Sequence, residues 1–141
     1  LTIKKLFIDE FFLTVANNHP LSQQTEIAIN DIGDESFILL EDVHCLSQQI
    51  QQFCWAQRFV PKVLFQASQI TTVKHLIRSG YGMSILPASA KLPSEDRGLS
   101  YIHLEQPTPH REIVLAYKNS LTTVGAALLK HLRQFTQNTI S

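Results

Sequence analysis

The residues that could do chemistry lie in the segment EDVHCLSQQIQQFCW (residues 41–55), which holds both cysteines of the chain, Cys45 and Cys54. His44 directly precedes the first of them. A thiolate is the nucleophilic form of cysteine, and a helix N-terminus or a neighbouring imidazolium favours it. Cys45 is therefore the candidate nucleophile, and Cys54 is the only other thiol with which it could pair within this chain.

The spacing of apolar residues around the cysteines predicts an amphipathic helix over about residues 45–58, with Cys54 on its buried face. Nine helical residues rise about 13–14 Å and turn the chain roughly 180° about the axis. A disulfide needs Cα atoms within about 7 Å, so one regular helix cannot contain a Cys45–Cys54 bond. If the bond forms, the helix must at least partly unwind, which is the physical content of a redox switch.

The same residues also have ordinary interpretations. Free cysteine is often a small buried hydrophobe, and a lone histidine such as His44 is more often a structural hydrogen-bonding residue. The polar face with Ser47, Gln48, Gln51 and Gln52 could be a solvated surface or an interface, and Trp55 is expected in the core or in an interface. No metal site is expected, because a spacing of nine matches no common zinc pattern and the other histidines are scattered.

Strand-like and helix-like segments alternate along the chain, which predicts an α/β fold with a mainly parallel sheet. Ligands in such sheets bind at the carboxyl ends of strands and at helix N-termini. Ser68 begins the second helix and is either a simple N-cap or, with Thr71, part of a ligand site. The predicted strands are 11–16, 36–40, 63–67, 83–87, 99–104 and 113–117, and the predicted helices are 45–58, 70–77 with Gly80 as cap, and 124–135.

The composition restricts the class of protein. The chain has 141 residues, enough for one domain with a core, and its 12 basic and 12 acidic residues balance. It therefore carries no electrostatic footprint for nucleic acid or an anionic membrane, and no apolar run is long enough to span a bilayer. Two cysteines fit a cytoplasmic chain better than a secreted one. Because it begins with Leu1 inside a strand-like run, we expect a fragment of a longer protein.

Four segments resemble one known family. The run LEDVHCL (residues 40–46), followed by Phe53-Cys54, resembles the redox segment of OxyR-type proteins, the peroxide-sensing members of the LysR-type transcriptional regulators. GYGMSILP (residues 80–87) resembles the glycine–proline segment common to LysR-type regulators. PTPHR (residues 107–111) resembles the family's entry to its returning strand, and residues 6–20 resemble its entry to the second subdomain.

The resemblance implies a regulatory domain with a periplasmic-binding-protein-like fold of two Rossmann-like subdomains. Residues 10–110 would form the second subdomain, complete and including the redox segment 41–55. Residues 1–9 and 111–141 would form part of the first subdomain with the crossover strands. An N-terminal winged helix-turn-helix domain that binds DNA would be missing from the chain.

The implied activity is regulation rather than enzymatic turnover, without a cofactor. Hydrogen peroxide would oxidise Cys45, and Cys54 would resolve the product to a disulfide. His44 would position or activate the thiolate, and Arg111 would supply positive charge near it. The implied partners are DNA, a second copy in a homodimer or homotetramer, RNA polymerase and a thiol reductant such as glutaredoxin, with no membrane, in the cytoplasm.

One departure from the family pattern is notable. OxyR-type proteins usually carry Arg-Asp after Cys-Leu, whereas this chain has Ser47-Gln48, so a guanidinium that could activate the thiol is absent. The alternative function is therefore a LysR-type domain that binds a small organic effector in the cleft between its subdomains, near Ser68 and Thr71, with incidental cysteines. A third interpretation is a thiol peroxidase, against which the glycine–proline segment argues.

Overall fold

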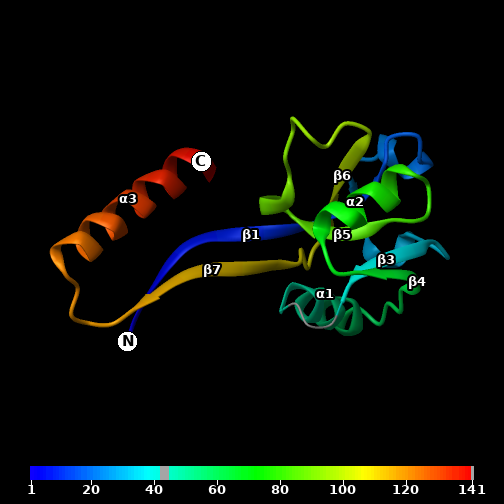
Figure 1. Ribbon diagram of the computed structural model, residues 1–141. Coiled ribbons are helices and arrows are strands. Elements are labelled where there is room, and N and C mark those ends of the chain that lie inside the picture. The colour runs from blue at the N-terminus through cyan, green and yellow to red at the C-terminus, as the bar shows by residue number, and fades with distance from the viewer. Residues whose placement is uncertain (42–44, 141) are drawn as a thin grey trace. The chain divides into compact units, whose positions relative to one another are not determined.

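The computed structural model describes residues 1–41 and 45–140, so the predicted role of His44 lies outside the described residues. The chain divides into two compact units: residues 1–9 with 111–141, and residues 10–110 (Figure 1). The strands are β1 (Thr2–Ala16), β2 (Glu26–Ile27), β3 (Ser36–Leu40), β4 (Lys62–Ala67), β5 (Ser84–Pro87), β6 (Leu99–Leu104) and β7 (His110–Tyr117). The helices are α1 (Cys45–Ala56), α2 (Ile70–Arg78) and α3 (Thr123–Ile140), with short 3-10 turns at Pro20–Gln23, Ile29–Asp31 and Ala88–Ala90.

The sheet of the 10–110 unit is mixed, so the expectation of a mainly parallel sheet is wrong. The strand order is β2-β6-β1-β5, and β1 runs antiparallel to both β5 and β6. β3 and β4 form a parallel pair, which a parallel bridge between Phe37 and Met83 joins to the start of β5. The prediction failed because parallel strands were inferred from helix–strand alternation, whereas β5 and β6, which are joined without an intervening α-helix, both run antiparallel to β1.

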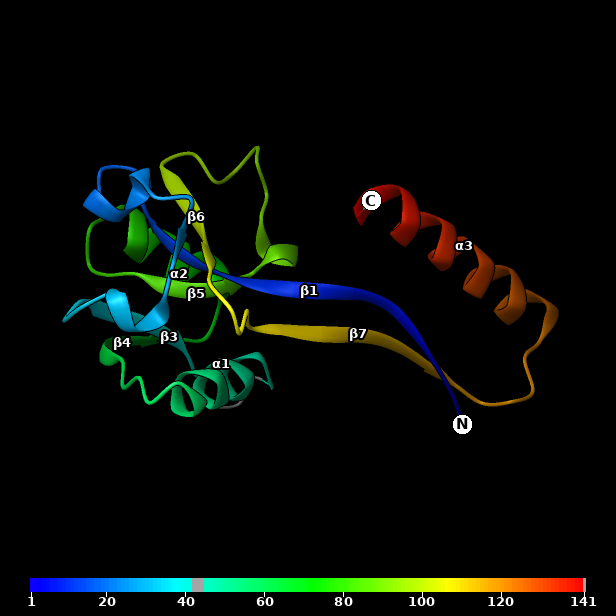
Figure 2. The same ribbon diagram turned by 180° about the vertical axis from the view of Figure 1, so that it is seen from behind.

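β3 lies in the core next to α1. Four of its five residues are buried, which matches its uninterrupted apolar sequence. Strands with such sequences are covered on both faces. Figures 1 and 2 show α1 and α2 on opposite sides of the β3–β4 pair, and both helices contact β3.

The ends of α2 test two sequence predictions. The N-cap residue is Gln69 rather than Ser68, because Ser68 still belongs to the turn that follows β4. At the other end, Gly80 has φ +85°, its N–H donates to Ile77, and the N–H of Tyr81 donates to Leu76. This is the Schellman pattern, which confirms Gly80 as the capping glycine.

The unit of residues 1–9 and 111–141 contains α3, nearly all of β7 and the first part of β1. Lys5 and Glu112 form an ion pair of 2.8 Å between the two strands. The helix predicted for residues 124–135 is present as α3, and Val124, Leu128 and Phe135 on it are more than half exposed. Across the described residues, no helix is long and apolar enough to cross a membrane.

Candidate functional site

The two cysteines lie on one regular helix and have opposite environments. α1 begins at Cys45, as the sequence predicts, and Cys45 is exposed. Cys54 lies in the last turn of the same helix, and only 3% of it is exposed. Both are free thiols. The predicted burial of Cys54 is confirmed.

Burial also decides the protonation state of Cys54. Desolvation raises the pKa of its thiol to about 11, against a smaller opposing effect of a backbone hydrogen bond. At neutral pH this thiol is therefore almost fully protonated and a poor nucleophile. Cys45 is therefore the more accessible of the two thiols.

Ser47 is buried, which corrects its expected place on the polar face of α1. It is 3% exposed, and its Oγ donates a hydrogen bond of 2.9 Å to the carbonyl of Leu40 at the end of β3. It also accepts a bond of 3.0 Å from Nε2 of Gln51. The signal for this was present in the sequence: Ser47 precedes Cys54 by seven residues, or two helical turns, and so shares its face.

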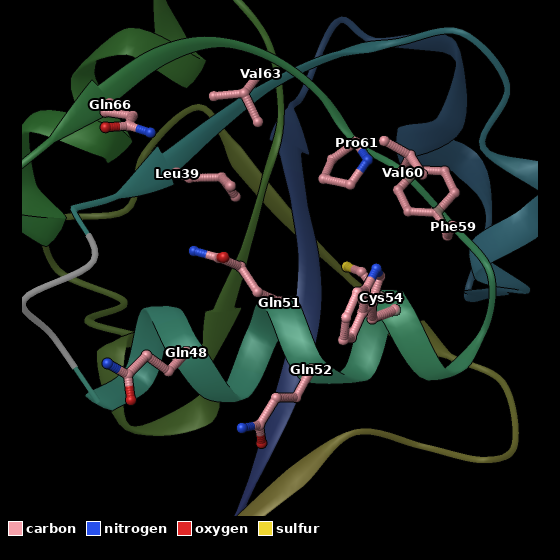
Figure 3. A pocket seen from close by; sticks show the side chains of 11 residues that line it. Leu39, Gln48, Gln51, Gln52, Cys54, Phe59, Val60, Pro61, Val63 and Gln66 are labelled. Atoms are coloured by element: carbon pink, nitrogen blue, oxygen red, sulfur yellow. The ribbon is translucent and has the colours of Figure 1, made fainter.

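A groove of about 540 Å³ lies between α1 and the strands β3 and β4 (Figure 3). The side chain of Gln51 is directed from the helix toward Leu39, whereas Gln52 points away from the strands. Trp55 is 82% exposed, so its expected place in the core is wrong and only the interface interpretation remains. The lining residues are Leu39, Gln48, Gln51, Gln52, Cys54, Trp55, Phe59, Val60, Pro61, Val63 and Gln66, none of which is charged.

The candidate ligand residues Ser68 and Thr71 lie beyond the carboxyl end of β4 and are exposed. Leu40 and Ala67, the last residues of β3 and β4, are paired neighbours, and the N–H of Glu41 donates to the carbonyl of Ala67. The segments leading to Cys45 and to Ser68 therefore leave the sheet at the same edge, as parallel neighbours must. No group of three or more histidine, cysteine, aspartate or glutamate side chains in the described ranges could hold a metal ion.

Arg111 is paired with a buried carboxylate. Its Nε and one terminal nitrogen each lie 3.0 Å from Oδ2 of Asp9, which is 1% exposed. Both residues belong to the unit of residues 1–9 and 111–141, whereas Cys45 belongs to the other. The described contacts therefore assign the guanidinium to Asp9, and its predicted action on Cys45 stays a prediction.

The fold is that of a family of regulatory domains. Residues 1–137 match the family model for the LysR substrate binding domain, and the chain belongs to that family. Its fold is accordingly the periplasmic-binding-protein-like fold of LysR regulatory domains, as the resemblance implied.

The relatives are transcriptional regulators rather than enzymes. The chain is 31% identical over 114 residues to the hydrogen peroxide-inducible genes activator of Pectobacterium carotovorum, which covers 80% of the chain and 38% of the relative. It is also 31% identical to the DNA-binding transcriptional dual regulator OxyR of Escherichia coli K12, covering 80% and 37%. The chain thus spans less than two fifths of the length of these relatives.

Solved structures share the fold over nearly the whole chain. A reduced form of OxyR from N. meningitidis is 26% identical with a TM-score of 0.77, covering 96% of this chain and 64% of that one. The effector binding domain of QuiR in complex with shikimate is 21% identical with a TM-score of 0.78, covering 99% and 67%. The chain is therefore an OxyR-like LysR-type regulatory domain.

Proposed function

We propose that this domain senses hydrogen peroxide through a reversible Cys45–Cys54 disulfide. One observation carries the proposal: a single regular helix, α1, holds an exposed thiol in its first turn and a buried thiol in its last. The rise of nine helical residues, about 13–14 Å, exceeds the reach of a disulfide by a factor of about two. Oxidation therefore cannot leave α1 intact.

The first chemical step takes place at Cys45. Its thiolate attacks one oxygen of hydrogen peroxide, an S–O bond forms, and the O–O bond breaks. The second oxygen leaves as hydroxide and is protonated to water. The product is a sulfenic acid at an exposed position of the chain.

The second step couples the chemistry to the fold. Unwinding of α1 releases Cys54 from burial, which removes the cause of its raised pKa and makes its thiolate accessible. This thiolate attacks the sulfenic sulfur, an S–S bond forms and the S–O bond breaks. The hydroxyl group leaves as hydroxide and takes up the proton that the Cys54 thiol released, which gives water. A thiol reductant such as glutaredoxin returns two electrons and two protons to restore both thiols.

The supporting roles follow the resemblance. His44 positions or activates the Cys45 thiolate, and Arg111 contributes positive charge to it. Residues 10–110 act as the second regulatory subdomain, and residues 1–9 with 111–141 belong to the first. The division of the chain into compact units at these same residues supports this assignment.

In the whole regulator, refolding of α1 changes how the copies of a homodimer or homotetramer contact one another. That change is transmitted to winged helix-turn-helix domains on DNA and to RNA polymerase, in the cytoplasm. The similarity to hydrogen peroxide-inducible activators supports this part of the proposal.

The direct test is the mass of the 41–58 peptide of the intact regulator after brief exposure to micromolar hydrogen peroxide and alkylation of free thiols. Loss of two hydrogens with Cys45 linked to Cys54 is expected. Two alkylated thiols after peroxide treatment would refute the proposal.

Two variants separate the roles of the thiols. Cys45→Ser should abolish the response to peroxide, and Cys54→Ser should leave Cys45 as a sulfenic acid or a mixed disulfide. A Cys45→Ser protein that still responds normally would show that another group senses the oxidant.

The second candidate function is recognition of a small organic effector in the cleft between the subdomains, with Ser68 and Thr71 as ligands. The QuiR domain shows that this fold can hold shikimate. Titration of the intact regulator with shikimate, monitored by isothermal calorimetry, tests this function. Saturable binding that Ser68→Ala and Thr71→Ala weaken would support it, and binding that neither variant changes would exclude these residues.

A further inference from the structure

The hydroxyl of Ser47 joins two elements that the redox change must separate. It lies in the first turn of α1, two residues after Cys45, and donates to the carbonyl of Leu40, the last residue of β3. This bond of 2.9 Å thus ties the first turn of α1 to the end of β3. The hydroxyl of a serine inside a helix usually faces solvent or bonds to a carbonyl of the same helix. The hydroxyl of Ser47 instead bonds to a carbonyl of a different element, β3.

The same hydroxyl is also tied to the middle of α1. Nε2 of Gln51 donates to it at 3.0 Å, and Gln51 lies one helical turn beyond Ser47. Both residues lie between Cys45 and Cys54 in the sequence. A disulfide that unwinds this stretch therefore removes the geometry on which both hydrogen bonds depend.

We propose that Ser47 is a positioning residue that sets the redox equilibrium of the switch by holding α1 on the end of β3 in the reduced form. The proposal rests on the proposed function, since it requires a Cys45–Cys54 disulfide. Ser47 stabilises the dithiol state and contributes nothing of this kind to the disulfide state. At the position where OxyR-type proteins usually carry arginine, this chain thus has Ser47, which acts through a hydrogen bond to β3 rather than through a charge.

The expected effect has a definite sign. A net hydrogen bond of ordinary strength corresponds to about a three- to tenfold change in an equilibrium constant. Loss of the hydroxyl destabilises only the reduced form, so the equilibrium constant for disulfide formation should increase by about that factor. A tenfold increase corresponds to a midpoint potential about 30 mV more negative.

The chain offers a matched control in Ser84. This serine is also buried, at 2% exposure, and its Oγ also donates to a backbone carbonyl of β3, that of Ile38, at 2.6 Å. It lies on β5, outside the stretch between the cysteines. Ser84→Ala should therefore destabilise both redox states alike and leave the midpoint potential unchanged.

The experiment compares variants of the intact regulator equilibrated in glutathione redox buffers, with the Cys45–Cys54 disulfide quantified by alkylation and mass. The central comparison is Ser47→Val against Ser47→Thr, because both side chains are β-branched and similar in shape and only threonine keeps a hydroxyl. The valine variant should form the disulfide about three- to tenfold more favourably than the threonine variant. Ser47→Ala should shift in the same direction but by less, because alanine also has the higher helix propensity.

Gln51→Leu provides a second route to the same result if the Ser47 variants fold poorly. It removes one of the two hydrogen bonds of the hydroxyl, so a smaller shift of the same sign is expected. Equal potentials for the valine and threonine variants, or an equal shift in Ser84→Ala, would overturn the proposal for Ser47 while leaving the redox switch intact. Absence of any disulfide in the unmodified regulator would instead overturn the proposed function and this inference together.

Discussion

Two polar clusters in the 10–110 unit hold the chain in different ways. Lys74 is 5% exposed, and its Nζ lies 2.7 Å from Asp96 and 2.5 Å from the carbonyl of Ala90. The other oxygen of Asp96 accepts from the hydroxyl of Tyr101 at 2.6 Å and from the N–H of Leu92. Ser47, by contrast, holds α1 on β3 through neutral hydrogen bonds.

The difference shows which of the two clusters holds its part of the chain more strongly. Breaking a buried ion pair leaves an uncompensated charge and costs several kilocalories per mole, whereas a neutral hydrogen bond contributes about 1 kcal/mol net. The Lys74–Asp96 cluster therefore holds the segment of residues 90–96 firmly against α2. In the proposed switch, the weaker Ser47 contacts are the ones that disulfide formation breaks.

The largest effect is expected from Asp96→Asn. This variant leaves Lys74 buried without its counter-charge and should lower the free energy of unfolding by about 3–5 kcal/mol. Urea denaturation followed by circular dichroism measures it. Asp34→Asn is the control, because Asp34 and Lys62 form an exposed pair of 3.9 Å that should contribute little. Equal losses in the two variants would contradict the contrast between buried and exposed pairs.

Acid should weaken the same cluster. Burial alone would raise the pKa of Asp96, but hydrogen bonds from Lys74 and Tyr101 outweigh it and hold the pKa below its usual value. The stability that Asp96 contributes is therefore complete above the unfolded-state pKa of about 3.9 and is lost as pH falls through the lower folded-state pKa. Urea midpoints measured from pH 7 to pH 3 should show the difference between wild type and Asp96→Asn shrinking only below about pH 4. A difference that already shrinks near pH 6 would argue against this carboxylate.

Variants of Arg111 test whether the proposed oxidation of Cys45 depends on a positive charge. Arg111→Ala should slow the oxidation of Cys45 by roughly two- to tenfold, because a cation favours the thiolate. Stopped-flow measurement of peroxide consumption by the intact regulator gives the rate constant. Since Arg111 also pairs with buried Asp9, Arg111→Lys separates charge from geometry, and exposed Arg97→Ala controls for net charge. An unchanged rate in Arg111→Ala would remove Arg111 from the reaction.

The smallest effect on stability is expected at Trp55, the single tryptophan of the chain. Because 82% of it is exposed, Trp55→Phe should change the free energy of unfolding by no more than about 0.5 kcal/mol. Its position on α1 nevertheless makes its fluorescence a reporter of refolding. Peroxide should shift the emission of wild type but not of Cys45→Ser, and identical emission in the two proteins would indicate that α1 does not refold.

Local features of the fold were predictable from the sequence. The strands at residues 36–40 and 99–104 have the predicted bounds, because uninterrupted or alternating apolar residues mark them and turn residues end them. The burial of Cys54 follows from helical periodicity, and the cap at Gly80 follows from the need for a positive φ. Each of these depends on residues close together in the chain.

The sequence by itself determined the two thiols, the helix that separates them and the faces on which they lie. Only the tertiary structure decided that Ser47 reaches the carbonyl of Leu40, and that Lys74 meets Asp96, 22 residues away. It also decided that β1 runs antiparallel to both its neighbours and that Trp55 is exposed. The physical reason is that helix periodicity is a property of neighbouring residues, whereas a buried polar group takes whichever partner the packing of distant strands and helices brings within reach.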